Sequence, residues 1–205
     1  MNLYIFWYTS LIMMIQLGEY LKVNGVKFVY FDVGNVLFSF SGGLEKLARM
    51  FEKPLQDVQS YWRSKDDDIC RGKLKPQEFW NLARNKFKYE GDDINFVDFW
   101  VSHFVKIQEG HDLAYKLAKN FQIGLLTNAY PTVIESVMGT DLLPNIQWVT
   151  IVKSCDYGFV KPERELLDVA LKKTGFKASE IILIDDLKDN CNKVIEYGWR
   201  SIVFN

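Results

Sequence analysis

The chain has 205 residues, of which 25 are Lys or Arg and 26 are Asp or Glu, and its net charge is -1 at pH 7. Because basic residues are not in excess, the composition argues against a nucleic-acid partner, and a small-molecule partner is expected. The cysteines Cys70, Cys155 and Cys191 form no CxxC pair for zinc or redox chemistry. A reducing, cytoplasmic location is therefore expected.

Residues 1–25 form an apolar N-terminal extension that contains the run NLYIFWYTSLIMMIQL. The run is shorter than the roughly 18 to 20 apolar residues of a membrane-spanning helix. No Lys or Arg precedes Lys22 to form the basic start of a signal peptide. Membrane insertion is therefore not expected. Two alternatives stay open: an accessory helix packed on the domain, or an upstream extension from a misassigned start.

The first β-like run, residues 26–31, leads into an insert at residues 43–108 that has helical periodicity only. Apolar residues recur three and four positions apart in residues 45–51, 55–62, 76–87 and 95–107. These amphipathic patterns predict a small helical bundle mounted over the rest of the fold. Its core would contain a group of large aromatic side chains: Trp62, Phe79, Trp80, Phe87, Phe99, Trp100 and Phe104.

From residue 109 to the end, β-like runs alternate with helical patterns. The β-like runs cover residues 122–127, 148–152, 181–184 and 201–204, and the helical patterns cover residues 111–121, 131–138, 163–175 and 190–198. Gly175 and Gly198 each follow a helical pattern, as C-terminal glycines do. The runs are nearly all apolar, which is typical of parallel strands covered on both faces. The sequence thus predicts an α/β fold with a doubly wound parallel sheet.

Polar residues stand where the strands of this sheet end. They are Asp32, Thr127, Asn128, Lys161, Asp185 and Asp186. Each residue alone is compatible with a helix cap or a turn, but a doubly wound sheet brings the carboxyl ends of its strands to one edge, where ligands bind. Carboxylates that meet in one crevice repel each other unless a cation joins them. Oxygen ligands beside a phosphate suit Mg²⁺.

This set of residues also suits phosphoryl transfer by positioning and electrostatics. A carboxylate can act as the nucleophile through an aspartyl-phosphate intermediate. Thr127 and the backbone N–H groups at Asn128 could hold the phosphoryl oxygens, and Lys161 could neutralise their charge. The expected partner is therefore a small phosphorylated metabolite.

Four motifs in order resemble those of the haloacid dehalogenase (HAD) superfamily. They are FDVGNVL at residues 31–37, LLTNA at 125–129, DYGFVKP at 156–162 and IILIDDLKDN at 181–190. The resemblance implies a HAD-like Rossmannoid core at residues 26–42 and 109–205. It also implies a C1 cap at residues 43–108 that closes over the substrate, as in C1-capped subfamily I. The FDxGNV pattern is similar to that of a branch that includes a sugar-1-phosphate phosphatase.

The resemblance also implies a role for each motif residue. Asp32 would be the nucleophile and a Mg²⁺ ligand, Asp186 the second carboxylate on the metal, and Asp185 a ligand directly or through water. Thr127 and Asn128 would bind the transferring phosphoryl group, and Lys161 would bridge it to Asp32. Asn190 would orient Lys161 or a metal-bound water.

Gly34 departs from the family pattern, because family phosphatases usually carry a second Asp at this position as general acid and base. Loss of such a group costs roughly 10²- to 10⁴-fold in rate, although the Gly34 carbonyl can still bind metal. Three interpretations follow. The chain is an active phosphatase that takes the proton from water, a cap residue or the substrate; or a catalytically weak binding protein; or a dehalogenase. The last is disfavoured because dehalogenases lack the acidic pair.

Other charged residues carry weaker expectations. The KDDD run at residues 65–68 is interpreted as a solvated turn rather than a metal site. His103 and His111 are expected in surface or packing roles, since neither lies beside a motif. Arg71 and Lys73 lie at a turn between predicted helices, where they could contact a substrate or remain exposed loop charges. The sequence predicts neither the substrate nor the oligomeric state.

Overall fold

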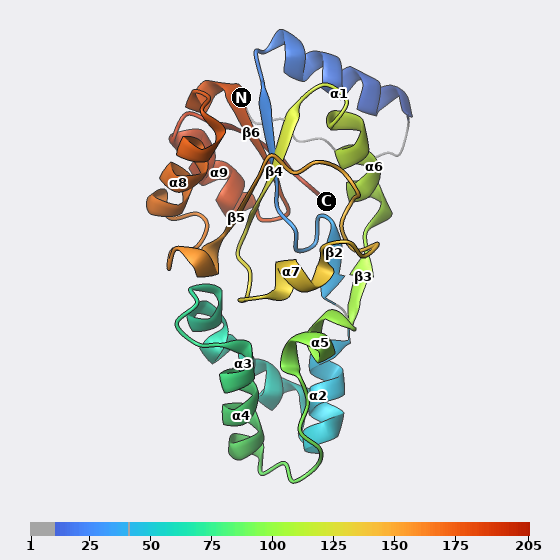
Figure 1. Ribbon diagram of the computed structural model, residues 1–205, viewed down its shortest axis with the longest axis vertical. Helices are drawn as coiled ribbons and strands as arrows, with labels where there is room; N and C mark the ends of the chain where they lie inside the picture. The colour runs from blue at the N-terminus through green and yellow to red at the C-terminus, as the bar shows by residue number, and fades with distance from the viewer. Residues whose placement is uncertain (1–10, 41) are drawn as a thin grey trace.

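The computed structural model describes residues 11–40 and 42–205, and its centre is a five-stranded parallel sheet (Figure 1). The strand order is β5-β4-β1-β6-β7, and every neighbouring pair is parallel. The strands are β1 (Phe28–Phe31), β4 (Gln122–Thr127), β5 (Thr150–Lys153), β6 (Ile181–Asp185) and β7 (Arg200–Val203). This arrangement confirms the predicted α/β fold with a doubly wound parallel sheet. The chain winds outward from β1 in both directions, so a ligand crevice is expected at the carboxyl end of β1.

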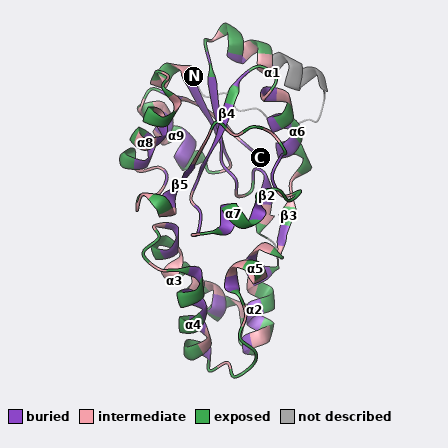
Figure 2. Ribbon diagram, viewed as in Figure 1, coloured by how far each residue is buried: buried purple, intermediate pink, exposed green. Residues whose placement is uncertain are grey.

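Helices cover both faces of the sheet, and the central strands β1 and β6 are accordingly buried throughout (Figure 2). The helices α1 (Leu11–Val23), α6 (Gln108–Leu117) and α7 (Val133–Val137) contribute to one core cluster. The helices α8 (Arg164–Thr174) and α9 (Lys188–Glu196) contribute to the other. Residues of β1 alternate between the clusters, because successive strand side chains point to opposite faces.

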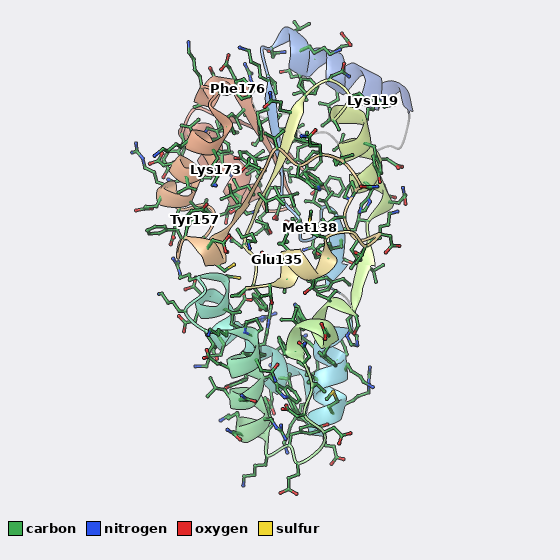
Figure 3. The ribbon with its side chains drawn as sticks, in the orientation of Figure 1. Lys119, Glu135, Met138, Tyr157, Lys173 and Phe176 are labelled. Carbon is green, nitrogen blue, oxygen red and sulfur yellow. The ribbon has the colours of Figure 1, made fainter. Side chains whose placement is uncertain are left out.

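The short 3-10 turn η1 (Ser154–Asp156) follows β5 and leads toward α8. The Lys173 ammonium of α8 lies 5.9 Å from the centre of the Tyr157 ring. Both side chains lie along the same flank of the molecule (Figure 3). Gly175 ends α8 in the left-handed conformation, with φ 71°, which confirms the predicted C-terminal glycine.

The helical insert, defined here as residues 43–101, lies at the end of the molecule opposite α1 (Figure 1). It contains α2 (Gly43–Phe51), α3 (Leu55–Cys70), α4 (Pro76–Phe87) and α5 (Phe96–Val101). Its core is aromatic: of the residues predicted for it, Phe79, Trp80, Phe87, Trp100 and Phe104 are buried, whereas Trp62 and Phe99 are only partly buried. Phe51 and Phe96 are buried there as well. Two short antiparallel strands, β2 (Phe38–Phe40) and β3 (Phe104–Lys106), join it to the rest of the chain.

Two sequence predictions about the insert are wrong. Residues 95–107 do not form one helix, because α5 ends at Val101 and β3 follows. Phe104 stacks on Phe38 across the strand pair with ring centres 4.7 Å apart, a partner that helical periodicity cannot reveal. Residues 65–68 are not a solvated turn, because they lie within α3.

The N-terminal extension is described in part, and residues 1–10 lie outside the described residues. Within α1, Leu17 and Leu21 are buried in the core cluster that also contains Leu113 and Leu117 of α6. This part of the extension is therefore an accessory helix packed on the domain. Among the described helices, none combines the length and the apolar character needed to cross a membrane.

Gly110 of α6 allows that helix to approach the loop that follows β1. A Cβ atom at this position would lie 1.8 Å from the carbonyl oxygen of Val36. We expect Gly110→Ala to lower the free energy of unfolding by about 2 kcal/mol or more, because neither backbone can yield without disturbing its neighbours. Urea unfolding followed by circular dichroism measures the change.

The matched control is Gly18→Ala in α1, where a Cβ atom would meet nothing within 4 Å. This change should be neutral or stabilise the protein by up to about 1 kcal/mol, since Ala has the higher helix propensity. Equal unfolding midpoints for Gly110→Ala and the wild type would show that the close approach has no energetic consequence.

Candidate functional site

The carboxyl ends of the central strands and the helical insert enclose a cavity of about 640 Å³. Asp32 directly follows β1, Thr127 is the last residue of β4, and Asp185 is the last residue of β6. The backbone N–H of Asp32 donates to the carbonyl of Ile184 at 2.8 Å, which fixes the first carboxylate beside β6. The cavity is lined by most of the residues that the sequence singled out: Asp32, Gly34, Thr127, Asn128, Lys161, Asp186 and Asn190.

The buried ammonium of Lys161 bridges two carboxylates. Its Nζ lies 2.7 Å from an oxygen of Asp32 and 2.7 Å from an oxygen of Asp185. Burial would lower the pKa of Lys161, but Asp185 and Asp32 outweigh this effect and raise the pKa above its usual value. Burial raises the pKa of Asp32 to about 7; Lys161 opposes this rise and Asp185 adds to it.

Asp185 is saturated by protein donors. One carboxylate oxygen accepts from the Leu187 N–H at 2.8 Å and the other from Lys161 at 2.7 Å. The Asn190 amide donates to both oxygens, at 3.0 and 3.1 Å. Asp185 is fully buried, whereas Asp32 and Asp186 line the cavity. This arrangement favours an indirect role for Asp185, in which it holds Lys161 while Asn190 orients Asp185.

The site has the composition of a cation site. Asp32, Asp185 and Asp186 place carboxylate oxygens within 4.8 Å of one another. Lys161 is the only lysine or arginine among the described residues that line the cavity, so negative charge is in excess. Burial raises the pKa of Asp186, which accepts a hydrogen bond from the Asn35 side chain at 3.0 Å. Hard oxygen donors and uncompensated charge together fit a divalent cation such as Mg²⁺.

Gly34 lies in a tight loop beside this cluster. The carbonyl of Val33 accepts from the N–H groups of Val36, Leu37 and Phe38 at 3.3, 2.9 and 3.2 Å. A Cβ atom on Gly34 would lie 2.8 Å from Cε2 of Phe40. The Phe40 ring therefore occupies the space that a side chain at position 34 would need. Neither Phe40 nor Asn35 was identified as a site residue from the sequence, although Asn35 belongs to the FDVGNVL motif.

The residues after β4 hold the segment that carries Lys161. The Asn128 side chain accepts from the Lys161 N–H at 2.7 Å and donates to the Lys161 carbonyl at 3.3 Å. Its two polar groups are thus used to position that segment. Thr127 is buried and lines the cavity. The proposed phosphate-binding roles of both residues stay predictions.

Arg71, at the end of α3, connects the helical insert to the same segment. Its guanidinium donates to both carboxylate oxygens of Glu163 at 2.9 and 2.7 Å, and to the carbonyl of Gly158 at 3.1 Å. Glu163 also accepts from the Val160 N–H at 3.0 Å, next to Lys161. Arg71 is therefore a structural bridge between the insert and the Lys161 segment.

The positions of Lys73, His111 and His103 show which of these residues lies at the cavity. Lys73 is not among the residues that line the cavity. His111 is buried, and its Nε2 lies 3.2 Å from the carbonyl of Leu37 and 3.1 Å from that of Leu142, which confirms a packing role. His103 was expected in a surface or packing role, but it lines the cavity, with Nδ1 2.7 Å from the carbonyl of Phe99.

The fold is shared with solved structures of HAD-family proteins. No protein-family model matches the sequence, and no curated protein matches it either. A HAD-family enzyme from Bacteroides thetaiotaomicron, solved with magnesium and inorganic phosphate, is 21% identical, with a TM-score of 0.75 over 88% of this chain and 95% of that chain.

Two further structures support the same assignment of fold. A predicted HAD-like hydrolase from Porphyromonas gingivalis is 19% identical, with a TM-score of 0.71 over 87% of this chain and 91% of that chain. A 2-haloacid dehalogenase from Pseudomonas syringae is 18% identical, with a TM-score of 0.62 over 88% of this chain and 86% of that chain. This chain therefore has the fold of HAD-family enzymes.

The raised pKa of Asp32 gives the metal-free protein a specific pH dependence. The folded-state value is about 7, against 3.8 for the unperturbed group. Between these pH values the folded state holds a proton that the unfolded state has lost, and this proton stabilises the folded state. Its contribution to the free energy of unfolding falls as pH rises above 3.8 and is lost at about pH 7. Asp32→Asn removes the titration. In EDTA, the melting temperature of Asp32→Asn minus that of the wild type should therefore rise by roughly 3 °C or more between about pH 5 and pH 8.

Asp68→Asn is the matched control, because Asp68 is an exposed carboxylate on α3 that does not line the cavity. Its melting temperature should follow the wild type at every pH. A pH-independent difference between Asp32→Asn and the wild type would contradict the assigned shift.

Proposed function

We propose that the protein is a Mg²⁺-dependent phosphatase that hydrolyses a small phosphorylated metabolite through an aspartyl-phosphate on Asp32. The observation that carries the proposal is the cluster of Asp32, Asp185 and Asp186, two of which hold the buried ammonium of Lys161, beside a cavity large enough for a small ester. The shared fold with a HAD-family enzyme that was solved with magnesium and phosphate supports it. A sugar phosphate is one candidate of suitable size.

Asp32 and Asp186, with the backbone carbonyl of Gly34, would hold the metal. Bound Mg²⁺ would supply positive charge beside the phosphoryl oxygens and polarise the bonds to phosphorus. Lys161 adds a second positive charge at Asp32, and its own position is fixed by Asp185 and Asn128. Thr127 would donate its hydroxyl proton to a phosphoryl oxygen. These groups are in place before substrate binds, so their reorganisation costs little.

The reaction has two steps. A carboxylate oxygen of Asp32 forms a bond to phosphorus as the bond from phosphorus to the leaving oxygen breaks, and the leaving alcohol takes a proton. Water then attacks the aspartyl-phosphate, which releases inorganic phosphate and regenerates the Asp32 carboxylate. With glycine at position 34, no side chain there supplies the proton, so water, a residue of the helical insert or the substrate supplies it.

The helical insert acts in this proposal as the cap that closes over the substrate. Aromatic side chains of the insert, notably Trp62 and Trp100, line the same cavity as Asp32. The Arg71 bridge and the hydrogen bond from Ser154 Oγ to the Cys70 carbonyl at 2.6 Å hold the insert against the strand ends. Closure of such a cap excludes bulk water from the phosphoryl group.

The first test is phosphate release from a panel of small phosphomonoesters, in Mg²⁺ or in EDTA. Turnover should require Mg²⁺, and Asp32→Asn should lower it by about 10³-fold or more, because the nucleophile is lost. Asp68→Asn should retain wild-type turnover. If the wild type and Asp32→Asn are equally inactive across the panel, the protein is a binding protein rather than a phosphatase.

A second test addresses the missing acid and base. Gly34→Asp alone places its side chain against the Phe40 ring, so it should give little gain. Combined with Phe40→Ala, the same substitution should raise turnover by about tenfold or more over Phe40→Ala alone, since it supplies a proton donor for the leaving oxygen. Equal gains from Gly34→Asp in the wild type and in Phe40→Ala would show that the Phe40 ring does not exclude a side chain at position 34.

A further inference from the structure

A carboxylate of the helical insert, Asp66 of α3, lines the same cavity as Asp32. One of its oxygens accepts a hydrogen bond from the Tyr130 hydroxyl at 2.5 Å. The Tyr130 oxygen in turn accepts from the indole N–H of Trp62 at 2.7 Å. Tyr130 follows β4 by three residues, so this chain of hydrogen bonds fixes Asp66 relative to the strand ends.

Asp66 has no cationic partner in the described part of the chain. The neighbouring Asp67 pairs with Arg71 at 2.8 Å, and the cavity's lysine, Lys161, pairs with Asp32 and Asp185. Burial raises the pKa of Asp66, with Tyr130 opposing the rise and Asp67 adding to it. A half-buried carboxylate of this kind is stabilised by any ligand that brings a positive charge.

Aromatic rings surround the same part of the cavity. The ring centres of Trp62 and Trp100 lie 6.2 Å apart, and those of Trp100 and Tyr130 lie 6.4 Å apart. All three side chains line the cavity. Aromatic faces beside a carboxylate form a favourable environment for an alkylammonium group, through cation–π attraction and charge pairing. A second anionic group on the ligand would instead be repelled by Asp66, and Glu45 adds a further carboxylate to the lining of the cavity.

We propose that the leaving alcohol of the substrate carries an ammonium group, which binds at Asp66 against the rings of Trp62 and Trp100. The substrate class is then a phosphomonoester of an amino alcohol, a class that includes phosphorylated amino sugars. Asp66 is the residue that determines this specificity, and the inference rests on the phosphatase function proposed above.

The test uses matched esters that differ in one terminal group. At each of several chain lengths, an aminoalkyl, a hydroxyalkyl and a carboxyalkyl phosphate of equal length are compared in Mg²⁺. At the best length, kcat/KM for the amino ester should exceed that for the hydroxy ester by about tenfold or more. The carboxy ester should be the poorest substrate. Asp66→Asn should lower the ratio of kcat/KM for the amino ester to kcat/KM for the hydroxy ester to about one.

Two further variants test whether the position of the Asp66 carboxylate determines the preference. Tyr130→Phe keeps the carboxylate but removes the hydrogen bond that orients it, so the amino preference should fall without being lost. Asp68→Asn, an exposed carboxylate on the same helix, should retain the full preference. Melting temperatures of all variants show whether each one is folded.

p-Nitrophenyl phosphate separates the two possible failures. If it is hydrolysed in Mg²⁺ while amino and hydroxy esters react equally, or carboxy esters react faster, the ammonium proposal is overturned and the phosphatase stands. If no ester is hydrolysed in Mg²⁺, the phosphatase function fails, and this inference fails with it.

Discussion

The ammonium of Lys161, held between Asp32 and Asp185, is the interaction on which the site depends. Burial of either carboxylate alone would be costly, and burial of both side by side would be more so. The lysine offsets this repulsion and ties together the ends of β1 and β6 with the segment after β5. Because Asn128 fixes the lysine backbone and Asn190 fixes Asp185, the ammonium is held from both sides. Most of the polar residues at the strand ends serve this one pair of contacts.

Other polar contacts link the site to the helical insert. Arg71 binds Glu163, which lies two residues beyond Lys161, and Asp66 binds Tyr130, which lies three residues beyond Thr127. Ser154 accepts from the Ala129 N–H at 3.0 Å and donates to the carbonyl of Cys70 in the insert. The first two contacts thus fall on segments that carry a site residue, and Ser154 binds Ala129, which directly follows Asn128. A movement of the insert would therefore change the surroundings of Lys161 as well as the size of the cavity.

The sequence predicted those parts of the structure that depend on regular periodicity. Apolar runs identified the strands, and parallel topology alone required Asp32, Thr127 and Asp185 to meet. The prediction failed where structure depends on the docking of one segment on another. β3 forms because Phe104 meets Phe38 across a strand pair, and residues 65–68 stay helical because α3 continues to the contact with η1. Phe40 was missed for the same reason, since it lies in no motif that periodicity or strand ends could identify. Asp66 belongs to the KDDD run, which was interpreted as a solvated turn because its place on α3 beside the cavity depends on the same docking.

Gly34 and Phe40 together change what the site requires of its substrate. Because the Phe40 ring occupies the space that an acid at position 34 would need, no side chain there donates a proton in the proposed reaction, and the leaving group departs with less help than usual. An ammonium group close to the leaving oxygen lowers the pKa of the corresponding alcohol by its charge, and thereby reduces the proton transfer needed as the bond breaks. Asp66 would partly neutralise that charge, so the effect depends on how far the ammonium lies from the oxygen. Glycine at position 34 would thus favour a leaving alcohol of low pKa, and Asp66 would favour an alcohol that carries an ammonium group, so both residues would select the same kind of leaving group.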